Sequence, residues 1–365
     1  MSLSAGIVGL PNVGKSTIFN AITAAGAESA NYPFCTIEPN VGIVDVPDER
    51  LEIIHRFIAT DRVLPAAVKI VDIAGLVAGA SKGEGLGNKF LGNIKETDAI
   101  LHVVRCFEDP DIVHVHGTID PRADIEVIEL ELALADIETL TKAHDRVSKK
   151  ARSGDKESIA ERDAFERARA LLLEGRSLRG DALTDREREL LRPLFLITRK
   201  PVLFVANVAE DDLAGESQLV AAVREHAAAT NAEVIVLCGG VEGEIAGMAP
   251  EEQKDFLAEY GLDAPGLDRL ARATYDLLGL ETYFTAGEKE IRAWTIRRGW
   301  TAPQGAGVIH TDFERLFIRA EVYGVDDLVT HGSEAEIKAK GKLRVEGREY
   351  VLRDGDVCHF LIGKS

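Results

Sequence analysis

The stretch GLPNVGKST (residues 9–17) matches the pattern G-x-x-x-x-G-K-S/T of a phosphate-binding loop. It directly follows an apolar strand pattern, AGIVG, and it opens a helical stretch, which is the context that the motif requires. Gly9 and Gly14 let the backbone curl around a phosphate, so that N–H groups and a helix N-terminus face the anion. Lys15 is expected to reach the β- and γ-phosphates, and Ser16 to offer its hydroxyl to Mg²⁺. The nucleotide contacts predicted from this loop are Asn12, Val13, Gly14, Lys15, Ser16 and Thr17.

The residues after this loop predict an α/β domain with an insertion and a C-terminal module. The runs AGIVG, AVKIVD, AILHVVR, VLFVAN and VIVLC are typical of buried parallel strands. Between the third and fourth runs, apolar residues recur at three- or four-residue steps on both sides of the loop SGDKES, which predicts a helical hairpin or coiled coil. The last segment has the short strand patterns IRAWTI, FIRAEV and YVLRDGDV around a brief helix near His310. The predicted domains are residues 1–127 with 200–280, the hairpin 128–199, and a small α+β module 281–365.

Two further elements indicate a nucleotide-triphosphate switch. Asp72, at the end of AVKIVD, begins the pattern D-x-x-G, which ends at Gly75. The carboxylate is expected to hold Mg²⁺ through water, and the Gly75 N–H to sense a γ-phosphate. Thr36, between the two motifs, is placed to supply a second hydroxyl to Mg²⁺. The order of these elements favours a nucleotide-triphosphate switch over an adenylate-type kinase. The glycines of the run 79–92 hint at a dinucleotide-binding motif, but the run does not directly follow a strand, so it is interpreted as a switch loop instead.

Composition restricts the partners. The chain has 365 residues with 43 Lys and Arg against 61 Asp and Glu, a net charge of −18 that disfavours wrapping of nucleic acid or an anionic membrane. No apolar run approaches the roughly 20 residues of a membrane span, and no leader pattern is seen. The four cysteines lack metal-ligand spacing, so we expect free thiols and a cytoplasmic location.

One segment of this acidic chain is basic. Residues 141–200 hold sixteen basic and eleven acidic side chains. The most basic part lies at the start of the segment and comprises Lys142, Arg146, Lys149, Lys150 and Arg152. It is either a solvated helix face or a basic arm for a polyanion, and the composition leaves both open.

Several motifs together resemble one family. GLPNVGKST, YPFCTIEPNVG, DIAGLVAGASKGEGLGNKFL and AILHVVRCFED are similar to Obg-related P-loop proteins, specifically the YchF/Obg-like ATPase branch. The resemblance covers essentially the whole chain. It implies a G domain with an inserted hairpin and a C-terminal TGS domain of β-grasp fold. It also implies Mg²⁺-dependent ATP hydrolysis and a link to translation and stress responses. The implied partner is the ribosome, expected to be bound by a monomer at its large subunit through rRNA contacts of the basic hairpin.

The base-reading motif departs from that of GTPases. Guanine-specific relatives use N-K-x-D after the corresponding strand, whereas here the strand ends in Asn207-Val208-Ala209-Glu210. A misplaced charge-assisted hydrogen bond forfeits about 1.5–3 kcal/mol, so guanine preference is weakened. The resemblance implies that Asn207 and the Val208 backbone read adenine, with Cys238 and Gly239 closing the pocket. A GTP-specific enzyme and a plain strand-end turn remain alternatives.

The group that activates water is not given by the usual motif. Many relatives carry Gln directly after D-x-x-G, but this chain has Leu76, which predicts slow intrinsic turnover. His114 and His116 are the nearest candidates, and the resemblance implies a functional role for His114, with Lys15 as the second catalytic residue. The alternative is that both histidines simply pack in a helix-capping loop, which is the interpretation favoured for His116. Asn12 matches a K⁺ ligand of some relatives, although Asn also suits a tight turn. A non-catalytic scaffold stabilised by nucleotide is the remaining alternative.

Overall fold

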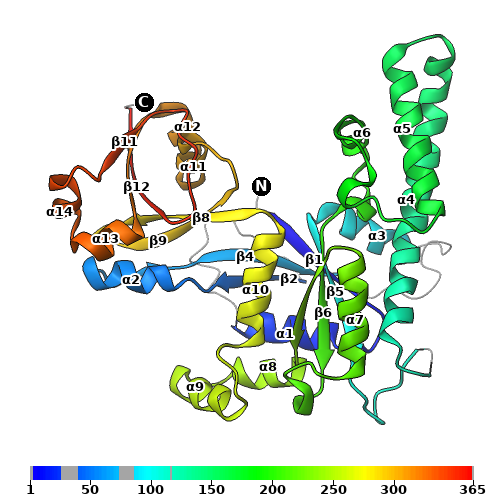
Figure 1. The fold of residues 1–365 in the computed structure, drawn as a ribbon, viewed down its shortest axis with the longest axis horizontal. Helices are drawn as coiled ribbons and strands as arrows, with labels where there is room; N and C mark the ends of the chain where they lie inside the picture. The colour runs from blue at the N-terminus through cyan, green and yellow to red at the C-terminus, as the bar shows by residue number, and fades with distance from the viewer. Residues whose placement is uncertain (1–2, 26–39, 74–85, 116, 364–365) are drawn as a thin grey trace. The chain divides into compact units, whose positions relative to one another are not determined.

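A six-stranded sheet carries the phosphate-binding loop (Figure 1). The computed structural model describes residues 3–25, 40–73, 86–115 and 117–363, so Thr36, Gly75, Leu76 and His116 lie outside the described residues. The strand order is β2-β4-β1-β5-β6-β7, and the pairs from β4 through β7 are parallel. The strands are β1 (Ser4–Val8), β2 (Val41–Val46), β4 (Ala66–Asp72), β5 (Ala99–Cys106), β6 (Val202–Val208) and β7 (Glu233–Leu237). The five predicted strands are therefore confirmed, and β2 is an addition.

Helices connect several of these strands, as expected for an α/β fold: α1 (Lys15–Ala25) follows β1, α3 (Leu86–Glu96) precedes β5, and α7 (Gln218–Ala229) joins β6 to β7. Three helices follow β7, namely α8 (Gly239–Ile245), α9 (Pro250–Glu259) and α10 (Gly266–Leu277). Helix α3 begins inside the Gly-rich run 79–92, so the later part of that run is helical; residues 79–85 lie outside the described residues.

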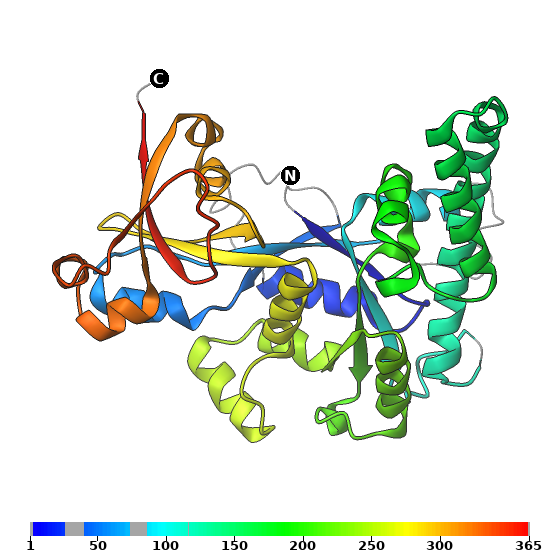
Figure 2. The same cartoon turned by 45° about the horizontal axis from the view of Figure 1, so that its top comes forward.

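The predicted hairpin is present as two long antiparallel helices, α4 (Pro121–Arg152) and α5 (Lys156–Leu173), which run side by side in Figures 1 and 2. Helix α4 starts seven residues before the predicted hairpin, because Asp120 caps it and Pro121 occupies its first turn. At 1.5 Å per residue its 32 residues span about 48 Å. Leu140 and Phe165 join a buried cluster between the helices.

The chain returns from the hairpin through α6 (Asp185–Leu191), which begins with the predicted capping box of Thr184 and Glu187. Asp136 of α4 fixes the next residues, accepting hydrogen bonds from the backbone N–H groups of Ile197 and Thr198 at 2.9 and 2.7 Å. A buried carboxylate with such partners fixes the path of the chain back to β6.

A second six-stranded sheet has the order β11-β10-β12-β8-β9-β3. Its strands are β3 (Val63–Leu64), β8 (Leu280–Ala286), β9 (Ile291–Arg297), β10 (Phe317–Gly324), β11 (Arg344–Glu346) and β12 (Asp356–Ile362). The associated helices are α2 (Glu49–Phe57), α11 (Ala302–Ile309), α12 (Thr311–Leu316), α13 (Val325–His331) and α14 (Glu334–Ala339). Tyr283, Phe317 and Leu352 belong to the core of this part.

One strand prediction in this part was wrong. The run YVLRDGDV forms an isolated bridge at Val351 and then a turn, and β12 begins only at Asp356. The Asp356 carboxylate accepts a hydrogen bond from the backbone N–H of Arg353, and Gly355 has a φ of +90°, so the local bonds favour a turn.

The contacts divide the chain into two compact units. Of the described residues, the first unit contains 3–25, 40–42, 69–73, 86–115 and 117–269, and the second contains 43–68 and 270–363. Residues 43–68, which the sequence analysis assigns to the nucleotide-binding domain, thus group with the C-terminal residues. The predicted domain boundaries themselves stay predictions.

Candidate nucleotide-binding site

The phosphate-binding loop connects β1 to α1 with a backbone that only glycine fits at two positions. Gly9 has a φ of +154°, and a Cβ there would lie 2.5 Å from the Val103 carbonyl oxygen. Gly14 has a φ of +94°, and a Cβ there would lie 2.1 Å from Asn207 Nδ2. Both close approaches exclude a side chain, so these glycines fix the loop as well as permit its turn.

Lys15 is the first residue of α1 and is buried. Its Nζ donates a 2.6 Å hydrogen bond to the Leu10 carbonyl, inside the loop. Burial lowers the Lys15 pKa to about 8, and the negative charge of Asp72 partly opposes that shift. Burial also raises the pKa of Asp72, against the effect of Lys15. Lys15 therefore lies in a low-dielectric environment, which strengthens its interaction with an anion.

The oxygen donors expected for Mg²⁺ fit that ion where the structure describes them. Ser16 is exposed in the first turn of α1, and Asp72 ends β4, paired in register with Ile7 of β1. A hydroxyl and a carboxylate are the hard oxygen ligands that Mg²⁺ prefers, with water or phosphate completing its shell. The third predicted ligand, Thr36, lies outside the described residues. Within the described ranges, no group of three or more His, Cys, Asp or Glu side chains could hold a metal ion.

Asn207, in β6, connects the phosphate-binding loop to the start of α8. Its Nδ2 donates to the Val13 carbonyl at 2.9 Å, and its Oδ1 accepts from the Gly239 N–H at 2.9 Å. Both ends of this buried amide thus bind backbone, one in the phosphate-binding loop and one at the start of α8. The amide therefore acts as a framework for the site, and its reading of adenine stays a prediction.

The other predicted base-pocket residues lie on either side of Asn207. Val208 is 2% exposed at the end of β6, and Cys238 is buried at the N-cap of α8. Glu210 is exposed and accepts a hydrogen bond from the Tyr260 hydroxyl, which raises the pKa of Tyr260 to about 12. The sequence analysis did not find Tyr260, because fifty residues separate it from Glu210 and no motif joins them.

His114 lies in the loop between β5 and α4 and is buried. Its Nε2 forms a 2.9 Å hydrogen bond with Asp124 Oδ2 in the first turns of α4. Asn12 of the phosphate-binding loop, with a φ of +62°, donates from Nδ2 to the carbonyl of Val113 at 3.1 Å. The structure thus brings His114's loop next to the phosphate-binding loop, but it turns the imidazole toward Asp124, a residue that the sequence analysis missed.

Arg105 holds the same loop by hydrogen bonds to its backbone carbonyls. It is 1% exposed at the end of β5, and its guanidinium donates to the carbonyls of Phe107, Asp109 and Ile112 at 3.1, 3.4 and 3.0 Å. A charged residue within the apolar run AILHVVRC was the available signal for this role, because a buried charge needs several hydrogen bonds.

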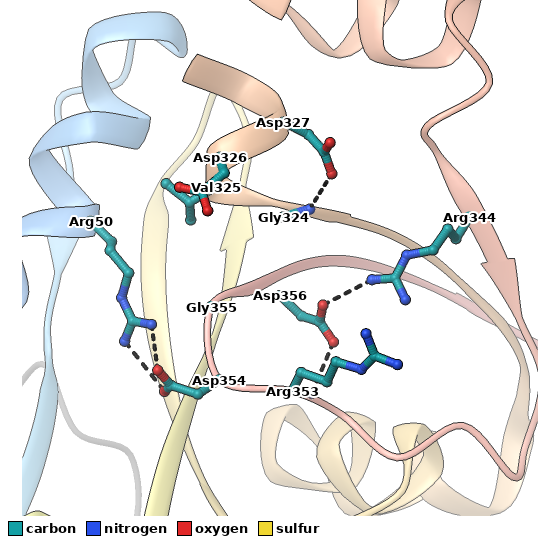
Figure 3. A pocket seen from close by; sticks show the side chains of 10 residues that line it. All are labelled: Arg50, Gly324, Val325, Asp326, Asp327, Arg344, Arg353, Asp354, Gly355 and Asp356. Carbon is teal, nitrogen blue, oxygen red and sulfur yellow. Dashed lines mark hydrogen bonds and ion pairs between the residues drawn. The ribbon is translucent and has the colours of Figure 1, made fainter. Parts of the chain in front are cut away.

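Two other features involve none of the predicted nucleotide contacts. The C-terminal unit has a polar hollow of about 380 Å³ (Figure 3). Arg50 pairs there with Asp354 at 2.5 Å, and Arg344 with Asp356 at 3.0 Å. These charges neutralise one another, and none of the predicted nucleotide contacts lines the hollow. The basic side chains of the hairpin, in contrast, are exposed at its tip, where α4 ends.

Comparisons with known proteins identify the family of the chain. Residues 4–142 match the family model MMR_HSR1, described as "50S ribosome-binding GTPase". Residues 280–363 match YchF-GTPase_C, described as "Protein of unknown function (DUF933)". The chain is 55% identical over 362 residues to the "Ribosome-binding ATPase YchF" of Bacillus subtilis, with 99% of each chain covered.

The chain belongs to the YchF family. The YchF protein of Escherichia coli O157:H7 is 52% identical over 361 residues, again with 99% of each chain covered. A solved structure, "Structure of the Schizosaccharomyces pombe YchF GTPase", superposes with a TM-score of 0.89 at 36% identity and covers 99% of this chain and 98% of that one. The predicted family and the P-loop NTPase fold are thereby confirmed. Among the described helices, none has the length and apolar character needed to cross a bilayer.

Proposed function

We propose that this chain is a ribosome-associated, Mg²⁺-dependent ATPase that acts as a nucleotide switch. The observation that carries the proposal is the phosphate-binding loop from Gly9 to Gly14. The buried Lys15 follows this loop, and Asn207 holds the loop by a hydrogen bond to Val13. Its YchF relatives in Bacillus subtilis and Escherichia coli are named ribosome-binding ATPases, which supports both parts of the proposal. A ribosomal partner also implies a cytoplasmic location.

The loop residues account for phosphate binding. Lys15 would exchange the Leu10 carbonyl for the β- and γ-phosphate oxygens, and the N–H groups from Val13 to Thr17 would surround the phosphates. Ser16, Thr36 and Asp72 would hold Mg²⁺, and Gly75 would sense the γ-phosphate. Mg²⁺, when bound, neutralises charge on the β- and γ-phosphates.

The base pocket favours adenine over guanine. The Lys of N-K-x-D covers the base with its long flexible side chain. Val208 has a short side chain and is buried, so it cannot cover the base in this way. Glu210 already accepts the Tyr260 hydroxyl, and its carboxylate extends one methylene beyond that of Asp. We therefore assign adenine reading to Asn207 and the Val208 backbone, with Cys238 and Gly239 beside them.

Competition of ATP and GTP for the purified protein tests this assignment. Wild type should bind ATP more tightly. The double variant Val208→Lys with Glu210→Asp, which rebuilds N-K-x-D, should shift the preference toward GTP by about ten- to a hundredfold. Tyr260→Phe is the matched control, since it frees Glu210 without rebuilding the motif. Tighter GTP binding by wild type would support the GTPase alternative, the activity named for the Schizosaccharomyces pombe relative.

His114 is proposed to position the attacking water, since it is the described histidine whose loop adjoins the phosphate-binding loop. Asn12 is proposed as a K⁺ ligand only secondarily, because its turn and its bond to Val113 already account for an Asn there. Phosphate release from ATP, with and without ribosomes and K⁺, separates these roles from a non-catalytic scaffold, which would release none.

The partner surface is proposed to be the hairpin tip, bound by a monomer to rRNA of the large subunit. Lys142, Arg146, Lys149 and Lys150 are exposed and share one face of α4. Lys142 forms an ion pair with Glu138, but this pair is exposed and therefore too weak to cancel the positive charge of the face. The description "50S ribosome-binding GTPase" for the model matching residues 4–142 supports the large subunit.

Co-sedimentation with ribosomes over a range of salt concentrations tests this surface. Changing the four basic residues to Glu should weaken binding and flatten its salt dependence by roughly one unit of slope per lost phosphate contact. The control changes the exposed Lys338, Lys340 and Lys342 of the C-terminal unit to Glu. If only the control weakens binding, the C-terminal module is the docking site.

A further inference from the structure

The loop between β5 and α4 exposes its apolar side chains and buries its polar one. Val113 is 75% exposed and Val115 is 46% exposed, whereas His114 between them is 7% exposed. Water and burial normally select the opposite arrangement, because apolar surface is stabilised by leaving water and a buried imidazole needs a partner. Specific contacts must therefore hold the loop in this state.

Three contacts do so, from three elements. Asp124 of α4 binds His114 Nε2 at 2.9 Å, and both side chains are buried. Asn12 of the phosphate-binding loop holds the Val113 carbonyl. Arg105 of β5 holds the preceding carbonyls, including that of Ile112. Of these contacts, only the one from Asp124 engages the imidazole that the proposed reaction needs.

We propose that Asp124 is a latch that stores His114 away from the reaction until a partner releases it. This inference rests on the proposed function, in which His114 acts on water. In the latched state the imidazole is shielded from solvent, so it cannot position a water molecule. In the released state the loop changes conformation, so that His114 leaves Asp124 and the side chains of Val113 and Val115 become buried. Asp124 is thus a positioning residue that sets how strongly turnover depends on the partner.

The place of Asp124 suggests what releases it. It lies near the start of α4, and Lys149 and Lys150 lie near the end of the same helix. A single continuous helix therefore joins the proposed ribosome-binding tip to the latch. The hydrogen bond and the exposed valines give the two-state element that such coupling requires.

The variant Asp124→Asn tests the latch. It keeps the size of the side chain but replaces a charged acceptor with a neutral one, so the stored state is weakened. We expect ribosome-free ATP turnover to rise roughly fivefold to tenfold, and the rate of His114 modification by diethyl pyrocarbonate, read by tandem mass spectrometry, to rise similarly. His310, whose side chain is 56% exposed, is the internal reference and should be unaffected.

The matched control is Asp120→Asn. Asp120 caps the same helix by accepting hydrogen bonds from Arg122 N and Ala123 N, and these contacts do not involve His114. Asn caps a helix about as well as Asp, so this loss of one carboxylate charge at the start of α4 should leave both rates unchanged. In the double variant His114→Ala with Asp124→Asn, the gain in turnover should disappear. Turnover that is unchanged or lowered in Asp124→Asn would overturn the latch.

A failure of the latch can be distinguished from a failure of the proposed function. If His114→Ala alone leaves stimulated turnover intact, the catalytic role of His114 fails; if His114→Ala is inactive while Asp124→Asn behaves as wild type, only the latch fails. If Asp124→Asn does not fold, the reactivity of His114 in the wild-type protein still tests the latch. Its His114 should react far more slowly than His310 in the free protein and faster with ribosomes and a non-hydrolysable ATP analogue. Equal reactivity of the two histidines in the free protein would overturn the latch.

Discussion

Two loops leave the same edge of the first sheet, because β1 and β5 are neighbouring parallel strands, and they are prepared for their tasks to different degrees. The loop after β1 is fixed by Gly14 packed against Asn207, and its Lys15 is already directed into the loop. The loop after β5 turns His114 inward and its valines outward. The comparison indicates that nucleotide binding is preorganised and that the hydrolytic step waits for a rearrangement.

The largest effect is expected from Lys15→Ala. Lys15 is the only loop residue from Gly9 to Thr17 with a cationic side chain, so its loss should weaken ATP binding by at least about a hundredfold, the value of two charge-assisted hydrogen bonds. Isothermal titration measures the affinity, with the exposed Lys142→Ala as the control for a lost positive charge. An unchanged affinity would mean that the loop does not bind phosphate.

A pair of glycine substitutions compares the rigidity of the two loops. Gly14→Ala places a Cβ against Asn207 and should lower the free energy of unfolding by about 3 kcal/mol. Gly117→Ala, in the loop after β5, also has a positive φ, of +77°, but meets nothing within 4 Å, so it should cost only about 1 kcal/mol. Urea unfolding measures both, and equal losses would remove the distinction between a packed and an open loop.

The smallest effect on ATP affinity concerns pH. Burial lowers the pKa of Lys15 to about 8, so the free protein loses the ammonium charge as pH rises through 8. Bound phosphate favours the charged form, so binding must take up a proton above that pH, and ATP affinity should fall by about tenfold between pH 7 and pH 9. Titrations at several pH values measure this, and an affinity that rises over the range would show that Lys15 does not face the phosphates.

Much of the fold could be predicted because its signals are local. The strand runs, the glycines and lysine of the phosphate-binding loop, and the capping box at Thr184 each follow from residues close together in sequence. The Mg²⁺ and γ-phosphate roles given to Thr36 and Gly75 stay predictions, because both residues lie outside the described ranges.

The parts that could not be predicted depend on pairing between distant residues or on competing local bonds. Residues 43–68 group with the C-terminal unit through contacts such as Arg50 with Asp354, more than 300 positions apart. The run YVLRDGDV has the alternation of a strand, but its aspartates and Gly355 favour a turn. The Asp124 contact was missed because Asp124 lies ten residues after His114 and no motif joins the two.

The most direct test of this account is phosphate release from ATP by wild type and His114→Ala, each measured with and without ribosomes and with ATP affinity measured in parallel. The account predicts slow release by free wild-type protein, clear stimulation by ribosomes, and loss of that stimulation in His114→Ala while ATP affinity stays within about threefold of wild type, because binding and hydrolysis use different loops. Ribosome-stimulated release by His114→Ala at the wild-type rate would contradict it.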